Sequence, residues 1–114
     1  MKRQRERILD MLDAVDQIER YAVRGRDALA SDELVRVWVI HHLQILREAA
    51  AALGRDFHDS HPDIPWAEMV AMRNVLVHDY GGVDANEVWR TVVRDLPPLK
   101  KQLTALADAL EAEG

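Results

Sequence analysis

The stretch RNVLVHDY, at residues 73–80, gathers side chains that can act on a charged group. Arg73 carries a permanent positive charge that binds anions, and His78 titrates near neutral pH and can accept or donate a proton. Asn74 and Tyr80 add hydrogen-bonding groups nearby. These residue types suit acid–base chemistry on an anionic substrate. A polar helix terminus, where His78 favours the helix dipole, explains the same residues from structure alone.

Helical geometry makes Arg73 the unusual residue of this stretch. In a helix over residues 66–78, about 100° per residue places Arg73 in the middle of the apolar stripe. Because an unpaired buried guanidinium is strongly unfavourable, Arg73 needs a carboxylate, a partner chain or a water-filled cleft. Asn74 and His78 are four residues apart and share the adjoining flank. A buried acid such as Glu48 would make Arg73 structural rather than catalytic.

The other histidines show that arginine–histidine spacing alone is a weak signal, because similar intervals recur elsewhere in the chain. His41 and His42 are adjacent on a helix and point about 100° apart, so we expect one buried and one exposed imidazole. His58 and His61 have a ligand-like spacing, but no further cluster completes a three-ligand site. We therefore predict neither a metal nor another cofactor.

The elements that position these residues are predicted to be helices throughout, since apolar residues recur at steps of three and four and no segment alternates like a strand. A polar connection, RDFHDSHPDI, separates the second helix from the third. The predicted helices are a first one ending near Gly25, a second from Ser31 as N-cap to Gly54, a third over 66–78, and a fourth opened by Asp84 and Glu87.

The last helix carries leucines and valines in 4-3-4-3 spacing, which favours core packing. Pro97 and Pro98 interrupt it, so we expect a kink or a restart with Asp95 as cap. Short connections and the absence of repeats favour an up-and-down bundle of four to five helices. Residues 1–114 are predicted to form one domain.

Composition limits the function classes. The chain has 114 residues, and 48% of them are hydrophobic. Its formal net charge is −5, so the molecule as a whole lacks the positive charge expected of a non-specific nucleic-acid binder. It has no cysteine, which excludes disulfides and thiol nucleophiles. The basic run at the N-terminus precedes no apolar core of signal-peptide length, and no apolar stretch is long enough to span a membrane. We expect a cytoplasmic protein with no membrane partner.

Residues 60–99 contain four short sequence motifs in a characteristic order: HPDIPW, MRNVLVHDY, VW and DLPPL. In these motifs the chain closely resembles the HepT-like branch of the HEPN superfamily, and the similarity extends over nearly its whole length. Two departures are Arg47, where that family commonly has a glycine before the glutamate, and the His41–His42 pair. Both lie outside the motif.

The resemblance implies an all-α, homodimeric HEPN-like bundle that acts as a toxin of a type VII-like toxin–antitoxin pair. Members of this branch are metal-independent endoribonucleases with an Arg-x4-His-x-Tyr motif. Carried over to this chain, the catalytic residues would be Arg73 and His78, with Asn74 in support. A minimal nucleotidyltransferase antitoxin (MntA-like) would silence the toxin by AMPylation of Tyr80.

The implied substrate is RNA, either tRNA or mRNA. The acidic balance of the chain favours an alternative, a non-catalytic helical partner or substrate-binding subunit of a minimal nucleotidyltransferase. A third interpretation is a purely structural helical dimer, in which Arg73 would matter only for stability.

Overall fold

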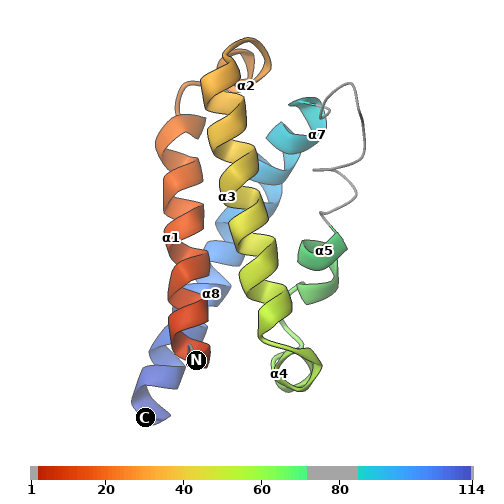
Figure 1. Cartoon of the computed structure of the whole chain (residues 1–114). Helices are drawn as coiled ribbons and strands as arrows, with labels where there is room; N and C mark the ends of the chain where they lie inside the picture. The colour runs from red at the N-terminus through yellow and green to blue at the C-terminus, as the bar shows by residue number, and fades with distance from the viewer. Residues whose placement is uncertain (1–2, 72–84, 114) are drawn as a thin grey trace.

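The computed structural model describes residues 3–71 and 85–113, and every regular element in these ranges is a helix (Figure 1). The prediction of an all-α fold is therefore confirmed. No helix within these ranges combines the length and the apolar character needed to cross a membrane. In chain order the elements are α1 (Gln4–Ala22), α2 (Arg26–Ser31), α3 (Glu33–Ala52), α4 (Arg55–Ser60), α5 (Trp66–Ala71), α7 (Ala85–Arg90), the π-helical turn η1 (Thr91–Asp95) and α8 (Leu96–Glu113).

Two long helices, α1 and α3, lie side by side and run in opposite directions (Figure 1). The short helix α2 joins them at one end of the bundle, and α4 follows α3 at the other end. Helix α8 packs against α1, and α5 packs against α3. The molecule is elongated, with extents of 45 × 26 × 25 Å, and its two termini lie at the end away from α2 (Figure 1).

The core forms where the apolar stripes of α1, α3 and α8 meet. Each stripe follows the three- and four-residue steps seen in the sequence, so one face of each helix is buried and the opposite face is solvated. The largest side chains that are essentially inaccessible to solvent are Ile8, Met11, Val15, Ile18, Val39, Leu43, Leu46, Val88, Leu96 and Leu103.

The last helical stretch is continuous but changes its hydrogen bonding before its two prolines. Pro97 and Pro98 have no N–H to donate to the carbonyls four residues earlier, so the α-helical pattern cannot continue unchanged there. The chain instead forms η1, in which the backbone N–H of Leu96 donates to the carbonyl of Thr91, five residues back. The predicted core role of the leucines is confirmed, since Leu96, Leu99 and Leu103 are at most 3% exposed.

The prediction that Ser31 caps the second long helix is wrong. Ser31 is the last residue of α2, and its hydroxyl donates to the carbonyl of Asp27. Asp32 is the N-cap of α3, and its carboxylate accepts from the backbone N–H groups of Leu34 and Val35 at 3.0 and 3.4 Å. A carboxylate at this position satisfies two of the free N–H groups and favours the helix dipole.

The segment predicted as a polar connection after Gly54 contains the helix α4. Its Phe57 is only 6% exposed, so one apolar side chain anchors this short helix to the core. Gly25 and Gly54 precede α2 and α4 with φ of +91° and +84°, a conformation that residues with a Cβ rarely adopt. These two glycines allow each long helix to end and a short one to start after a sharp turn.

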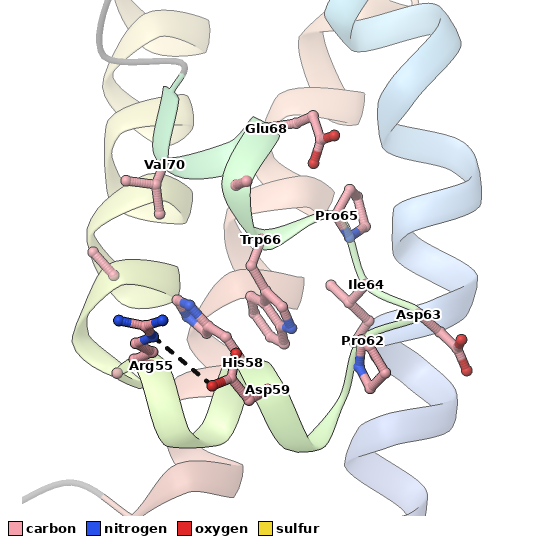
Figure 2. A pocket seen from close by; sticks show the side chains of 13 residues that line it. Arg55, His58, Asp59, Pro62, Asp63, Ile64, Pro65, Trp66, Glu68 and Val70 are labelled. Carbon is pink, nitrogen blue, oxygen red and sulfur yellow. Dashed lines mark ion pairs between the residues drawn. The ribbon is translucent and has the colours of Figure 1, made fainter.

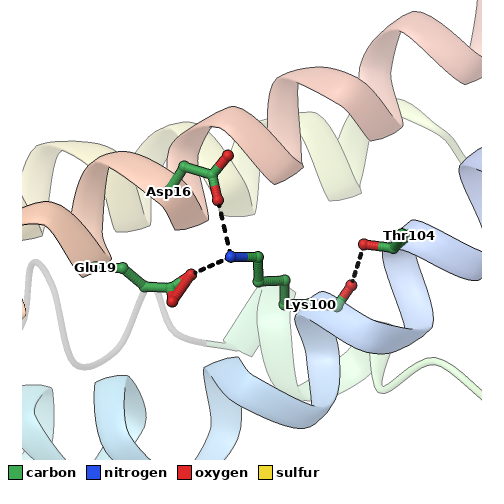
Figure 3. Close-up of polar contacts among 4 residues, drawn as sticks. All are labelled: Asp16, Glu19, Lys100 and Thr104. Atoms are coloured by element: carbon green, nitrogen blue, oxygen red, sulfur yellow. Dashed lines mark hydrogen bonds and ion pairs between the residues drawn. The ribbon is translucent and has the colours of Figure 1, made fainter.

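A charged cluster joins α1 to α8 on the surface (Figure 3). The ammonium group of Lys100 lies 2.8 Å from a carboxylate oxygen of Glu19 and 3.1 Å from one of Asp16. The hydrogen bonds to Glu19 and then to Asp16 raise the pKa of Lys100 above its ordinary value of 10.5. This cluster links two acidic residues of α1 to Lys100 in the first part of α8.

Candidate functional site

The four motif residues, Arg73, Asn74, His78 and Tyr80, lie outside the described residues, within 72–84. So does the part of the predicted third helix beyond Ala71, where α5 ends. The described elements that flank this segment in the chain are α5 before it and α7 after it. Both belong to the packed bundle, because α5 contacts α3 and α7 contacts α2 and η1.

Helix α5 is held in place by its first turn. Trp66 and Met69 are 5% and 3% exposed, so the two largest side chains of this short helix are in the core. The indole N–H of Trp66 donates to the carbonyl of His61 at 2.9 Å, and the backbone N–H of Met69 donates to the carbonyl of Pro65 at 3.1 Å. The residues that directly precede the motif segment are therefore anchored to the core.

Three rings from α4 and α5 pack together beneath this helix. The imidazole of His58 stacks on Trp66 with a centroid distance of 4.6 Å and an interplanar angle of 10°, and Phe57 meets Trp66 edge-on at 5.8 Å. His58 Nε2 lies 2.7 Å from the carbonyl oxygen of Ala50. Because a carbonyl can only accept, Nε2 carries a proton and donates it to the last turn of α3. We call Phe57, His58 and Trp66 the ring anchor of α5.

An open hollow of about 1130 Å³ borders the ring anchor, between α4 and α5 (Figure 2). Arg55 lies in it and faces Asp59, with 3.9 Å between Nε and the carboxylate. Asp63 and Glu68 also line the hollow. Among the residues that the structure describes, three carboxylates and one arginine line this hollow, a balance that does not favour phosphate.

The histidines of the two sequence pairs, His41–His42 and His58–His61, have different surroundings. His41 is exposed and His42 is 9% exposed, which confirms the prediction of one exposed and one buried imidazole. His42 Nδ1 lies 2.8 Å from the carbonyl oxygen of Trp38. His61 contacts the ring of Phe57 at 4.5 Å. In the part of the chain that the structure describes, no three His, Asp or Glu side chains are grouped closely enough to hold a metal ion.

Glu48, which the sequence suggested as a buried acid for Arg73, is not buried, and Arg73 itself lies outside the described residues. Its side chain is 69% exposed, and its carboxylate lies 3.8 Å from Arg47 within the same helix. A residue this accessible remains solvated and does not create a buried acidic site.

Sequence reasoning missed a chain of rings across α1 and α3. Tyr21 lies edge-on to Trp38 with a centroid distance of 5.2 Å, and Trp38 packs against His42 at 4.4 Å. The four-residue spacing of Trp38 and His42 was a signal for their contact. Nothing local in the sequence brings Tyr21 to Trp38, because the two residues meet only when α1 and α3 pack.

Comparison with known proteins shows which family this sequence belongs to. The family model described as Ribonuclease HepT-like matches residues 11–106. A protein of Thermococcus cleftensis named Probable ribonuclease HepT is 38% identical over 109 residues, which cover 93% of this chain and 98% of that protein. A protein of Methanocaldococcus jannaschii, provisionally named as an RNase, is 38% identical over 73 residues, or 64% of this chain and 67% of that protein. No solved structure gives a significant match.

Proposed function

Because this chain belongs to the ribonuclease HepT-like family of the HEPN superfamily, we propose that it is a metal-independent endoribonuclease that uses Arg73 and His78. The observation that carries the proposal is that the matched residues, 11–106, include the whole RNVLVHDY motif. The anchored helix α5 supports it, since catalytic side chains need elements that hold them in place.

The chemistry follows from the two side chains. His78 takes the proton of a ribose 2′-hydroxyl, and the resulting oxygen attacks the adjacent phosphorus. Arg73 stabilises the additional negative charge on the phosphorane. The bond between phosphorus and the 5′-oxygen then breaks, and a protonated acid supplies the proton that this oxygen needs. The products are a 2′,3′-cyclic phosphate and a 5′-hydroxyl. Asn74 orients the phosphate or fixes the tautomer of the histidine.

A homodimer fits this reaction, because one histidine can act as the base while the partner's histidine is the acid. The family resemblance is the support for this assembly. Its test is the mass of the full chain in solution by sedimentation equilibrium. A monomer at concentrations where RNA is cleaved would rule out a shared site.

We extend the proposal to regulation: the chain is a toxin whose Tyr80 is AMPylated by a minimal nucleotidyltransferase antitoxin. The Tyr80 oxygen attacks the α-phosphorus of ATP, pyrophosphate leaves, and the phenolic proton passes to solvent or to a base of the transferase. The attached AMP places a phosphate and a nucleoside close in sequence to Arg73 and His78, where they compete with RNA. Cleavage and silencing would then share one site.

The test of the nuclease is RNA cleavage in EDTA by wild type, His78→Ala and a matched control, His61→Ala. Removal of a general base lowers the rate by about 100-fold or more, whereas the control keeps wild-type activity. Equal cleavage by wild type and His78→Ala would contradict the assignment. Cleavage that requires added divalent metal would contradict the metal-independent mechanism.

The net charge of −5 favours a second candidate, a non-catalytic partner of the nucleotidyltransferase. Co-expression with a small nucleotidyltransferase, followed by intact mass, tests the partnership for both candidates, and the EDTA assay separates them. We expect mass gains in steps of one AMP that are lost in Tyr80→Phe and kept in Tyr21→Phe, the other tyrosine of the chain. Gains that persist in Tyr80→Phe would remove Tyr80 as the site.

A further inference from the structure

A second hollow, of about 460 Å³, lies between the end of α1 and the first turns of α3. The rings of Tyr21 and Trp38 form part of its lining. The side chains around them include Arg24 from the turn that follows α1 and Leu34, Val37 and His41 from one face of α3. We call this hollow the Tyr21–Trp38 groove.

The ring of Trp38 is held by the bundle before any ligand arrives. The indole N–H of Trp38 donates to the carbonyl of Gln17 at 2.9 Å, which ties the ring to α1. Behind it the buried imidazole of His42 packs at 4.4 Å, and His42 is itself bonded to the carbonyl of Trp38. Both Tyr21 and Trp38 remain partly exposed. Rigid rings bind a flat ligand with little further loss of conformational freedom.

Positive charge lies directly at these rings. The guanidinium of Arg24 is 5.1 Å from the centroid of Tyr21, and that of Arg20 is 6.0 Å from it. Within the described residues neither guanidinium forms an ion pair. Asp32 supplies the one carboxylate among the described lining residues, and this carboxylate accepts hydrogen bonds from the backbone N–H groups that it caps. The hollow beside α5 has the opposite balance among its described lining residues, with three carboxylates and one arginine.

The apolar side of the groove is open to solvent. Leu34 is 81% exposed and Val37 is 57% exposed, one turn apart on α3. Exposed apolar side chains lie here beside aromatic rings and beside arginines that form no ion pair with any described residue. This combination matches the requirements of an unstacked nucleobase, which needs a ring to stack on and a cation for its phosphate. The groove is at the α2 end of the bundle, and α2 contacts α7, the helix that follows the motif segment.

We propose that the Tyr21–Trp38 groove is a subsite for one unpaired base of single-stranded RNA, with Arg24 at the adjoining phosphate. The proposal rests on the proposed function, in that RNA is the substrate, and it adds a contact outside the motif. Trp38 and Tyr21 supply the stacking surface, and Arg24 supplies the charge.

The test is binding of a fluorescent single-stranded 2′-O-methyl RNA oligonucleotide, which cannot be cleaved through its 2′-oxygen, to the full chain. Loss of a stacked ring in Trp38→Leu weakens binding by about tenfold, whereas Trp38→Phe retains most of it. Arg24→Gln weakens binding and reduces its salt dependence, because one phosphate contact is lost. The matched control is Arg55→Gln, an exposed arginine on α4 at the other end of the bundle. Circular dichroism establishes that each variant is folded.

Two results would overturn the subsite. One is wild-type affinity and salt dependence in both Trp38→Leu and Arg24→Gln. The other is loss of binding together with dissociation of an oligomer in sedimentation, which would identify the groove as a surface between copies of the chain. Cleavage of unmodified RNA is measured separately. Wild type that cleaves RNA while the variants bind normally defeats the subsite alone, and wild type that binds through the groove without cleaving defeats the nuclease alone.

Discussion

His58 has two roles in holding α5, and they can be separated by substitution. Its ring stacks on Trp66, and its Nε2 donates to the carbonyl of Ala50 at the end of α3. The same carbonyl also accepts from the backbone N–H of Leu53, at 3.3 Å, so it is not left without a partner when the imidazole is removed. The loss should therefore be that of one hydrogen bond and one ring contact.

We predict that His58→Ala lowers the free energy of unfolding by about 1–2 kcal/mol, the sum of a hydrogen bond and an aromatic pair. His58→Phe keeps a ring over Trp66 and loses about 1 kcal/mol, because only the hydrogen bond is gone. Urea unfolding followed by circular dichroism measures both. Equal stability of His58→Ala and wild type would show that the ring anchor does not stabilise the fold.

At the level of single residues, the RNVLVHDY motif could be recognised from the sequence, because the short motifs before and after it occur in a characteristic order around Arg73 and His78. The contacts between Tyr21 and Trp38, and between His58 and Trp66, could not be predicted in this way. Each pair meets through the packing of two helices, and no local spacing encodes that. The expectation for Glu48 failed in the opposite way: its charge suited a buried acid, but its side chain on α3 faces solvent.

The short helices depend on the glycines that precede them. Gly54 has φ of +84° and ψ of 165°, outside the left-handed helical region in which asparagine is tolerated. A Cβ built on Gly54 would meet nothing within 4 Å, so space does not limit substitution there. The backbone conformation alone should determine the cost.

We predict that Gly54→Ala and Gly54→Asn each destabilise the protein by about 1–3 kcal/mol, with no advantage for asparagine. Thermal unfolding of both variants measures the effect, and Ala51→Gly, an exposed helical position nearby, is a control for flexibility in the last turn of α3. A markedly more stable Asn variant would show that this residue relaxes into the left-handed helical region.

At the level of elements, the long amphipathic helices were predictable because each buries a stripe that repeats over several turns. Helices α2 and α4 were not, since six residues provide fewer than two turns of periodicity. Ser31 and Asp32 are both good N-cap residues, and the choice between them is made by where α2 ends. The π-helical turn follows from Pro97 and Pro98, but the sequence equally allowed a kink.

For the whole molecule, the distribution of charge matters more than its sum. A net charge of −5 opposes the approach of RNA. Among the residues that the structure describes, however, Arg20 and Arg24 at the α2 end form no ion pair, while three carboxylates line the hollow beside α5. RNA should therefore approach the α2 end of the bundle rather than the α4 end. The binding experiment compares these two ends directly through Arg24 and Arg55.

Charge also stabilises the contact between α1 and α8, because Lys100 on α8 forms ion pairs with Asp16 and Glu19 on α1 (Figure 3). The pKa of Lys100 lies above its ordinary value of 10.5 in the folded protein, so the folded state holds this proton more tightly than the unfolded chain does. The stabilisation is therefore complete below pH 10.5 and is lost as the pH rises through the raised pKa. The side chain of Lys100 is 42% exposed, so screening by solvent reduces this stabilisation.

We predict that Lys100→Met lowers the free energy of unfolding at pH 7 by about 0.5–1 kcal/mol, the range of a partly exposed ion pair. Lys101→Met is the matched control, since Lys101 is an exposed lysine one position along the same helix. Urea unfolding at a series of pH values measures the difference between each variant and wild type. For Lys100→Met the difference should stay constant from neutral pH to about pH 10 and shrink above the ordinary lysine pKa of 10.5, because deprotonation removes the pair from wild type as well. A difference that persists in strongly alkaline solution would mean that the effect of Lys100 does not come from its charge. An equal loss in Lys101→Met would mean that the effect is not specific to the pairing of Lys100 with Asp16 and Glu19.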